Sequence, residues 1–133
     1  MENKDIQSIL KLERIVFETI EFKRINFSSD HELKIQIQSN IAQKQNGEVY
    51  KVTLTLKGDK PEEYTFDISL SGFFTIQHEE GISEETKKML ITKNTIAILM
   101  PYLRSEVSLL TAQPGVDCVI LPPFNINKIL DER

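Results

Sequence analysis

The sequence has one cysteine, no tryptophan and no long hydrophobic run, and these shortages exclude several classes of protein. Cys118 is the only cysteine among 133 residues, so one chain can form neither an internal disulfide nor a thiolate metal cage. The longest candidate apolar run, 95–100, is far shorter than the roughly 20 residues that span a membrane. No secretory signal is found at the N-terminus, so we expect a cytoplasmic protein without membrane insertion.

Basic residues are too few for a nucleic-acid-binding protein. Sixteen Lys and Arg against 20 Asp and Glu give a formal net charge of -4, which opposes attraction to phosphate backbones. The 40% hydrophobic and 27% charged residues are ordinary for a globular protein, and the length predicts a single domain over residues 1–133.

Residues that could carry catalysis are isolated from one another. His31 and His78 stand far apart without metal-ligand spacing. Ser105, Ser108 and Cys118 lie in no nucleophile motif, and the five glycines form no phosphate-binding loop. We therefore predict no metal, no cofactor and no enzymatic activity, and we expect Cys118 to serve as a small hydrophobe in the apolar run 118–121.

Alternating apolar and polar residues predict β-strands in the first half of the chain. Segments 33–38, 52–57 and 64–70 alternate in this way, which is typical of half-buried antiparallel strands. Gln45-Asn46-Gly47 and Gly58-Asp59-Lys60-Pro61 lie between them and predict a meander of hairpins. We expect a bulge or kink at Gly72, after which the last strand continues to about Gln77.

The segment from Leu12 to Ile25 fits two structures. Leu12, Ile15, Val16 and Ile20 have helical spacing, whereas the many β-branched and aromatic residues favour a strand. Periodicity alone leaves the choice open, and the composition leads us to predict a strand.

The second half of the chain predicts helices. Ser83 is a suitable N-cap, Lys93-Asn94 predicts an interruption, and Pro101 predicts a bend in a longer second helix that ends before Pro114-Gly115. A last short helix is expected from Asn125 to Leu130. The apolar stripe of the longer helix comprises Ile96, Leu99, Met100, Leu103, Val107 and Leu110.

That stripe is wider than one sheet face requires. Ile98, Tyr102 and Leu109 extend it sideways. One interpretation is a single monomer core. The other assigns the wide helix to subunit assembly and the region 121–130 to the capture of apolar polypeptide.

Three motifs, in this order, resemble the SecB family of export chaperones. They are Ser71-Gly72-Phe73-Phe74-Thr75-Ile76, Ile98-Leu99-Met100-Pro101-Tyr102-Leu103-Arg104 and Leu121-Pro122-Pro123-Phe124-Asn125-Ile126. The segments 12–17 and 48–52 are also similar to the first and third strands of the family.

The resemblance implies an α+β subunit with a four-stranded antiparallel sheet, a long packed helix and a short C-terminal helix. It implies a homotetramer in which Ile98, Tyr102 and Leu109 lie at an oligomer interface. It also implies holding of unfolded preproteins without ATP, in a groove that includes a crossover segment from Asn26 to Glu32. The implied groove residues are Phe27, Phe124, Ile126, Ile129 and Leu130.

The chain differs from the family pattern where the SecA motor docks. Family members present acids on the exposed sheet face and carry a long C-terminal extension. Asp67 keeps one matching acid, Thr19 replaces another, the sequence ends at Arg133, and the crossover lacks the tryptophan common in the family.

Two other functions remain open. SecB-like proteins also occur beside toxin-antitoxin pairs, where a dedicated chaperone protects a labile antitoxin. The more distant alternative is a small-molecule or acyl-thioester enzyme that uses Glu106, which requires a dry polar pocket around that carboxyl.

Overall fold

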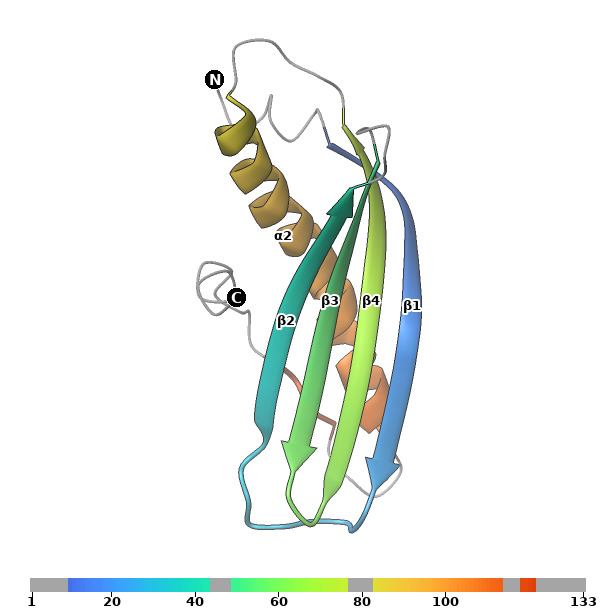
Figure 1. The fold of residues 1–133 in the computed structure, drawn as a ribbon. Helices are drawn as coiled ribbons and strands as arrows, with labels where there is room; N and C mark the ends of the chain where they lie inside the picture. The colour runs from blue at the N-terminus through green and yellow to red at the C-terminus, as the bar shows by residue number, and fades with distance from the viewer. Residues whose placement is uncertain (1–9, 44–48, 77–82, 114–117, 122–133) are drawn as a thin grey trace.

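The computed structural model describes residues 10–43, 49–76, 83–113 and 118–121, which form a four-stranded antiparallel sheet beside one long helix (Figure 1). The elements in chain order are β1 (Leu10–Arg24), β2 (Lys34–Gln43), β3 (Val49–Lys60), β4 (Tyr64–Ile76) and α2 (Glu84–Thr111). The predicted α+β class is confirmed. The predicted helix from Asn125 to Leu130 lies outside the described residues.

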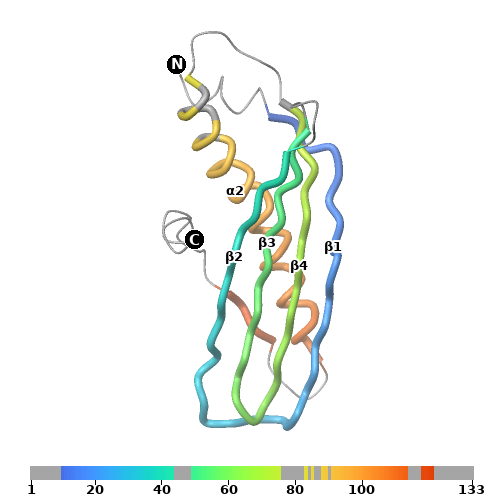
Figure 2. Tube along the Cα trace, viewed as in Figure 1, coloured from blue at the N-terminus to red at the C-terminus, as the bar shows by residue number. Residues whose placement is uncertain are grey.

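The strand order is β1-β4-β3-β2, and every pair is antiparallel. The strands β2, β3 and β4 form the predicted meander, whereas β1 pairs with β4 at the edge opposite β2. The chain must therefore cross the end of the sheet between β1 and β2, past the turn that joins β3 to β4 (Figure 2). We call residues 25–33 the crossover, and it includes the predicted segment from Asn26 to Glu32.

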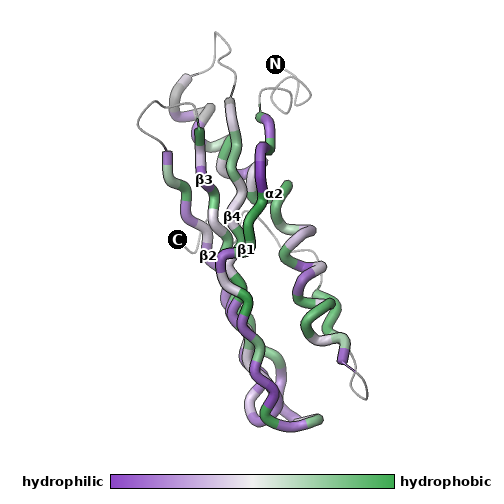
Figure 3. Tube along the Cα trace, turned by 90° about the vertical axis from the view of Figure 1, so that its right-hand side faces the viewer, coloured by the Kyte–Doolittle hydropathy of each residue, from purple (hydrophilic) through white to green (hydrophobic). Residues whose placement is uncertain are grey.

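One face of the sheet packs against α2, and the other face points away from it (Figure 3). Because successive side chains of a strand point to opposite faces, the buried apolar side chains of β3 and β4 are all at even-numbered positions and lie in the helix-covered layer. The buried core comprises Val52, Leu54, Leu56, Tyr64, Phe66, Ile68, Leu70, Phe74, Ile96, Leu99, Met100, Leu103, Val107 and Leu121.

Two bulges in β1 explain why its sequence resembles a helix. The pairing with β4 passes over one residue between Leu12 and Arg14 and another between Phe17 and Thr19. Each extra residue reverses the alternation of faces. Opposite the stretch of β4 from Phe66 to Phe74, the β1 residues that pair with helix-facing positions therefore include steps of three, and they are Leu12, Ile15, Phe17, Ile20 and Phe22.

The predicted bulge at Gly72 is wrong, and the alternative of a kink there stays a prediction. The β3–β4 register continues unbroken through Gly72, with Phe74 buried on the helix side and Phe73 on the opposite face. A Cβ added at Gly72 would lie 2.6 Å from Leu99 Cδ2. The glycine therefore allows α2 to approach the sheet closely, which is the other common role of glycine in a strand.

The predicted turn at Gly58 begins too early. β3 continues through Gly58 to Lys60, and the turn comprises residues 61–63. The ring of Phe66 covers Gly58, since an added Cβ would lie 2.2 Å from Phe66 Cζ. Gly58 thus makes room for an aromatic side chain of the neighbouring strand rather than for a turn. The predicted connection at 45–47 lies outside the described residues.

The predicted break at Lys93-Asn94 is also wrong, because α2 is one helix of 28 residues. Ile91 and Ile96, on either side of this dipeptide, are both buried, so the burial of apolar side chains continues across the junction. α2 also continues through the exposed Pro101, and a bend there stays a prediction. Within the described residues, no helix is sufficiently long and apolar to pass through a membrane.

The segment 118–121 returns along α2 and is tied to it by side chains of the helix. Val119 N donates to Thr111 Oγ1 (2.7 Å), and Ser108 Oγ donates to Val119 O (2.8 Å). Arg104 donates to Leu121 O from Nε (3.1 Å) and from its terminal nitrogen (3.0 Å). These bonds position Leu121, which is buried in the core.

Candidate functional site

The flank of α2 beside its buried stripe carries uncovered apolar side chains. Tyr102 and Leu109 are 47% and 70% exposed, and Ile98 is also exposed, whereas Leu99 and Leu103 are fully buried. Clustered exposed apolar groups are typical of interaction surfaces. We call Ile98, Tyr102 and Leu109 the helix flank; its accessibility fits the predicted interface without testing it.

The segment 118–121 adds an exposed apolar residue that the sequence analysis did not single out. Ile120 is 79% exposed beside a hollow of about 230 Å³. The prediction that Cys118 packs as a small hydrophobe is wrong, because its side chain is exposed. The residues that line the hollow are Pro101, Arg104, Ser105, Ser108, Ile120 and Leu121.

The crossover presents Phe27 to solvent. Its side chain is 78% exposed, and its backbone N donates to Asn26 Oδ1 (2.8 Å). Phe27 is therefore not part of the monomer core formed by the described residues. The other predicted groove residues, Phe124, Ile126, Ile129 and Leu130, lie outside the described residues.

A polar cluster that the sequence analysis missed holds the start of the crossover. The backbone nitrogens of Ile25 and Asn26 donate to Glu63 O (2.7 and 3.1 Å), and Arg24 donates to Asn26 O (3.2 Å). The only sequence signal for this site is Pro61, which suits the second position of a tight turn.

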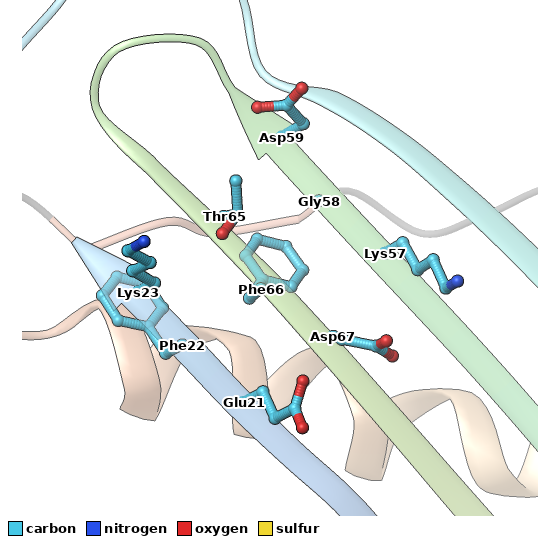
Figure 4. Close-up of a pocket in the computed structure, with 9 residues that line it drawn as sticks. All are labelled: Glu21, Phe22, Lys23, Lys57, Gly58, Asp59, Thr65, Phe66 and Asp67. Atoms are coloured by element: carbon cyan, nitrogen blue, oxygen red, sulfur yellow. The ribbon is translucent and has the colours of Figure 1, made fainter. Parts of the chain in front are cut away.

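Asp67 lies on the sheet face that points away from α2. It pairs in register with Glu21 of β1 and Lys57 of β3, beside a hollow of about 420 Å³ (Figure 4). The charged residues that line the hollow are Glu21, Lys23, Lys57, Asp59 and Asp67. This surface is mixed in charge rather than uniformly acidic.

Further along the same face, hydroxyl and carboxylate groups bond to one another. Glu18, the extra residue of one β1 bulge, accepts a hydrogen bond from Ser71 Oγ and another from Lys51 Nζ (3.1 Å). Thr53 and Ser71 also share a bond of 2.8 Å. The Ser71 and Lys51 bonds lower the pKa of Glu18 below its ordinary value. Thr19, where the family carries an acid, pairs with Ser69 in register.

The described residues offer little for catalysis. They contain no group of three or more His, Cys, Asp or Glu that could hold a metal ion. His31 Nε2 lies 3.5 Å from Glu62 Oε2 and both side chains are largely exposed, while His78 lies outside the described residues. Glu106 is half-buried and is not among the residues that line the hollow beside Ser105 and Ser108.

Comparison with known proteins relates this chain to one family. A family model described as preprotein translocase subunit SecB matches residues 7–133. The chain is 27% identical to the protein-export protein SecB of Alcanivorax borkumensis, across 96% of this chain and 87% of that protein. It is 30% identical to the SecB of Dechloromonas aromatica, across 75% of this chain and 67% of that protein.

Among solved structures, the chain is similar to the SecB-like chaperone of Mycobacterium tuberculosis in complex with a ChAD peptide from an antitoxin. The TM-score is 0.72 with 13% sequence identity, and the match covers 92% of each chain. This likeness shows that the two proteins share a fold.

The four-stranded antiparallel sheet and the long helix of the described residues thus have the SecB-like fold. The chain belongs to the SecB family.

Proposed function

We propose that this protein is a non-enzymatic holding chaperone that binds unfolded polypeptides without ATP and serves protein export. The observation that carries the proposal is Phe27, an aromatic side chain that is 78% exposed on a crossover whose backbone is bonded to the β3–β4 turn. Membership of the SecB family supports the same function.

Burial of apolar groups supplies enough free energy for such holding. One Leu, Ile or Phe side chain contributes roughly 1.5 to 3 kcal/mol when buried, so three or four contacts give about 5 to 10 kcal/mol before costs. Ordering of the client offsets much of this gain. Single sites are therefore weak, and several sites on one assembly raise the apparent affinity without energy input.

The proposed assembly is a cytoplasmic homotetramer in which the helix flank is covered by other subunits. Ile98, Tyr102 and Leu109 support it, because they are exposed on the single chain although they are apolar. Docking of the SecA motor on the sheet face around Asp67 is proposed as well. The mixed charge of that face, with Lys57 and Lys23 beside the acids, favours a weaker contact than an acidic surface would give.

The holding function is tested by aggregation of a chemically unfolded client in nucleotide-free buffer. We expect suppression at roughly stoichiometric chaperone, unchanged when ATP is added. Pairing Phe124→Ala with Ile129→Ser should weaken suppression while the melting temperature stays the same, because the proposed groove residues contact the client rather than the core.

Met89→Ser is the control, since Met89 is a large apolar residue, 75% exposed, near the start of α2. This end of α2 lies at the opposite end of the sheet from the crossover (Figure 1). It should leave suppression unchanged. A lower melting temperature with normal holding for the Phe124 and Ile129 pair would place those residues in the core and contradict the groove.

A second candidate function is a chaperone dedicated to an antitoxin. The similar structure from Mycobacterium tuberculosis, which carries a bound antitoxin peptide, favours this alternative. Recovery of cellular clients with the intact protein separates the two: many precursors indicate export, and one antitoxin indicates the dedicated role.

A further inference from the structure

The first peptide of the crossover is held from both sides. Glu63 O accepts hydrogen bonds from Ile25 N (2.7 Å) and Asn26 N (3.1 Å). The Arg24 guanidinium donates to Asn26 O (3.2 Å). Both backbone polar groups of Asn26 are therefore bonded immediately before the exposed Phe27.

The turn between β3 and β4 aims the Glu63 carbonyl at this peptide. Glu63 N donates to Lys60 O (3.0 Å), Pro61 occupies the second position, and Glu62 has a φ of 68° in the third. These are the features of a type II turn, whose third position usually holds glycine or asparagine. A side chain is disfavoured in this left-handed conformation, so the turn keeps a strained geometry that the surrounding contacts must stabilise.

Arg24 is held in turn by two aromatic rings of the sheet and by a residue just past α2. Its guanidinium carbon lies 5.4 Å from the centre of the Phe22 ring and 5.5 Å from that of Tyr64. Its Nε donates to Gln113 Oε1 (2.9 Å), just past the end of α2. One side chain thus links the crossover to the sheet and to the helix.

The Glu63 carboxylate completes the cluster. Its side chain is only 10% exposed, with Lys60 Nζ 2.7 Å from Oε1 and an Arg24 nitrogen 4.0 Å from Oε2. The contact between Lys60 and Glu63 is an ion pair, and it raises the pKa of Lys60 above its ordinary value. Two cations therefore compensate one nearly buried carboxylate, whose desolvation would otherwise oppose this arrangement.

We propose that Arg24 and Glu63 are positioning residues for client binding, because they fix the Asn26 peptide and thereby the place at which Phe27 meets a client. This inference rests on the proposed holding function. Arg24 and Glu63 do not contact the client in this account; they act through Phe27.

A thermodynamic cycle tests the role. Binding of fluorescein-labelled, reduced and carboxymethylated lactalbumin, which stays unfolded, is measured for the wild type, Arg24→Lys, Phe27→Ala and the double variant. Lysine keeps the charge but cannot reproduce the forked bonds. We expect Arg24→Lys to weaken binding by about threefold to tenfold, the worth of about one hydrogen bond. The double variant should bind no more weakly than Phe27→Ala alone.

Amide hydrogen exchange provides a direct second readout. The amides of Ile25 and Asn26 should exchange faster in Arg24→Lys and in Glu63→Gln. Glu18→Gln is the matched control, because it alters an ion pair with Lys51 on the other sheet face without touching the crossover. It should leave both the affinity and these two amides unchanged.

The outcomes separate the two proposals. If the wild type does not bind the probe, the holding function and the positioning role both fail. If the wild type binds but Arg24→Lys has no effect on affinity, or weakens it by the same factor with and without Phe27, only the positioning role is overturned.

Discussion

Apolar residues lie both on the sheet-facing side of α2 and on its helix flank, but only those on the sheet-facing side are buried. Leu99, Leu103 and Val107 are almost completely buried against the sheet, whereas Tyr102 and Leu109 remain about half to two-thirds exposed only a few residues away. Hydrophobicity therefore does not separate the residues that build the fold from those that remain available. The difference is whether the sheet covers them, and an apolar side chain left uncovered in one chain is suited to a partner.

The largest expected effect comes from charging the uncovered flank. Tyr102→Asp combined with Leu109→Asp should split the proposed tetramer into dimers or monomers, because an interface would have to bury unpaired carboxylates. Light scattering at micromolar concentration measures the mass. Four subunits in the wild type are expected, and a wild-type monomer would contradict the assembly.

A substitution on the buried, sheet-facing side of α2 should instead lower the stability of the fold. Leu103→Ala should lower the free energy of unfolding by about 2–5 kcal/mol, because it leaves a cavity between the helix and the sheet. Denaturant unfolding measures this loss. Ala97→Ser, an exposed position on the same helix, is the control and should change stability by less than about 0.5 kcal/mol.

A smaller effect is expected where the helix and the sheet approach most closely. Gly72→Ala should destabilise the fold by about 1–3 kcal/mol, because the added Cβ would meet the Leu99 side chain at 2.6 Å. If Gly72→Ala is neutral, the close approach is not what requires glycine there. Combining it with Leu99→Ala should recover part of the loss, since the two changes share one contact.

The smallest effect concerns the uncovered sheet face. The pKa of Glu18 is lowered by Ser71 and Lys51, so its bonds stabilise the folded state above the ordinary carboxyl pKa. This contribution is lost as the pH falls through the lowered value. Glu18→Gln should therefore be slightly less stable than the wild type at neutral pH. The difference in their free energies of unfolding should become smaller in acid, as measured by unfolding across pH. A difference that grows in acid would contradict this account.

Much of the fold could be predicted from alternation and composition, and the exceptions have identifiable causes. The β1 segment is ambiguous in sequence because bulges at two places convert steps of two into steps of three. The expected helix break at Asn94 does not occur, because Ile91 and Ile96 on either side of it are both buried, and this burial outweighs the capping preference of asparagine.

The candidate site was predictable only in part. Phe27 follows from the family resemblance together with its place in a segment between strands, and its side chain is exposed. Arg24 and Glu63 could not be identified, because their importance arises from contacts such as that between Arg24 and Gln113, which are 89 residues apart. No local sequence pattern indicates a contact between residues so far apart in the chain.

Mapping the bound client tests the central claim, that uncovered apolar residues serve partners, most directly. Hydrogen exchange of the wild type is compared with and without saturating unfolded lactalbumin. We expect the crossover, residues 25–33, to become protected, because a client that covers Phe27 also shields the backbone around it. Unchanged exchange in the crossover at full occupancy would contradict the account.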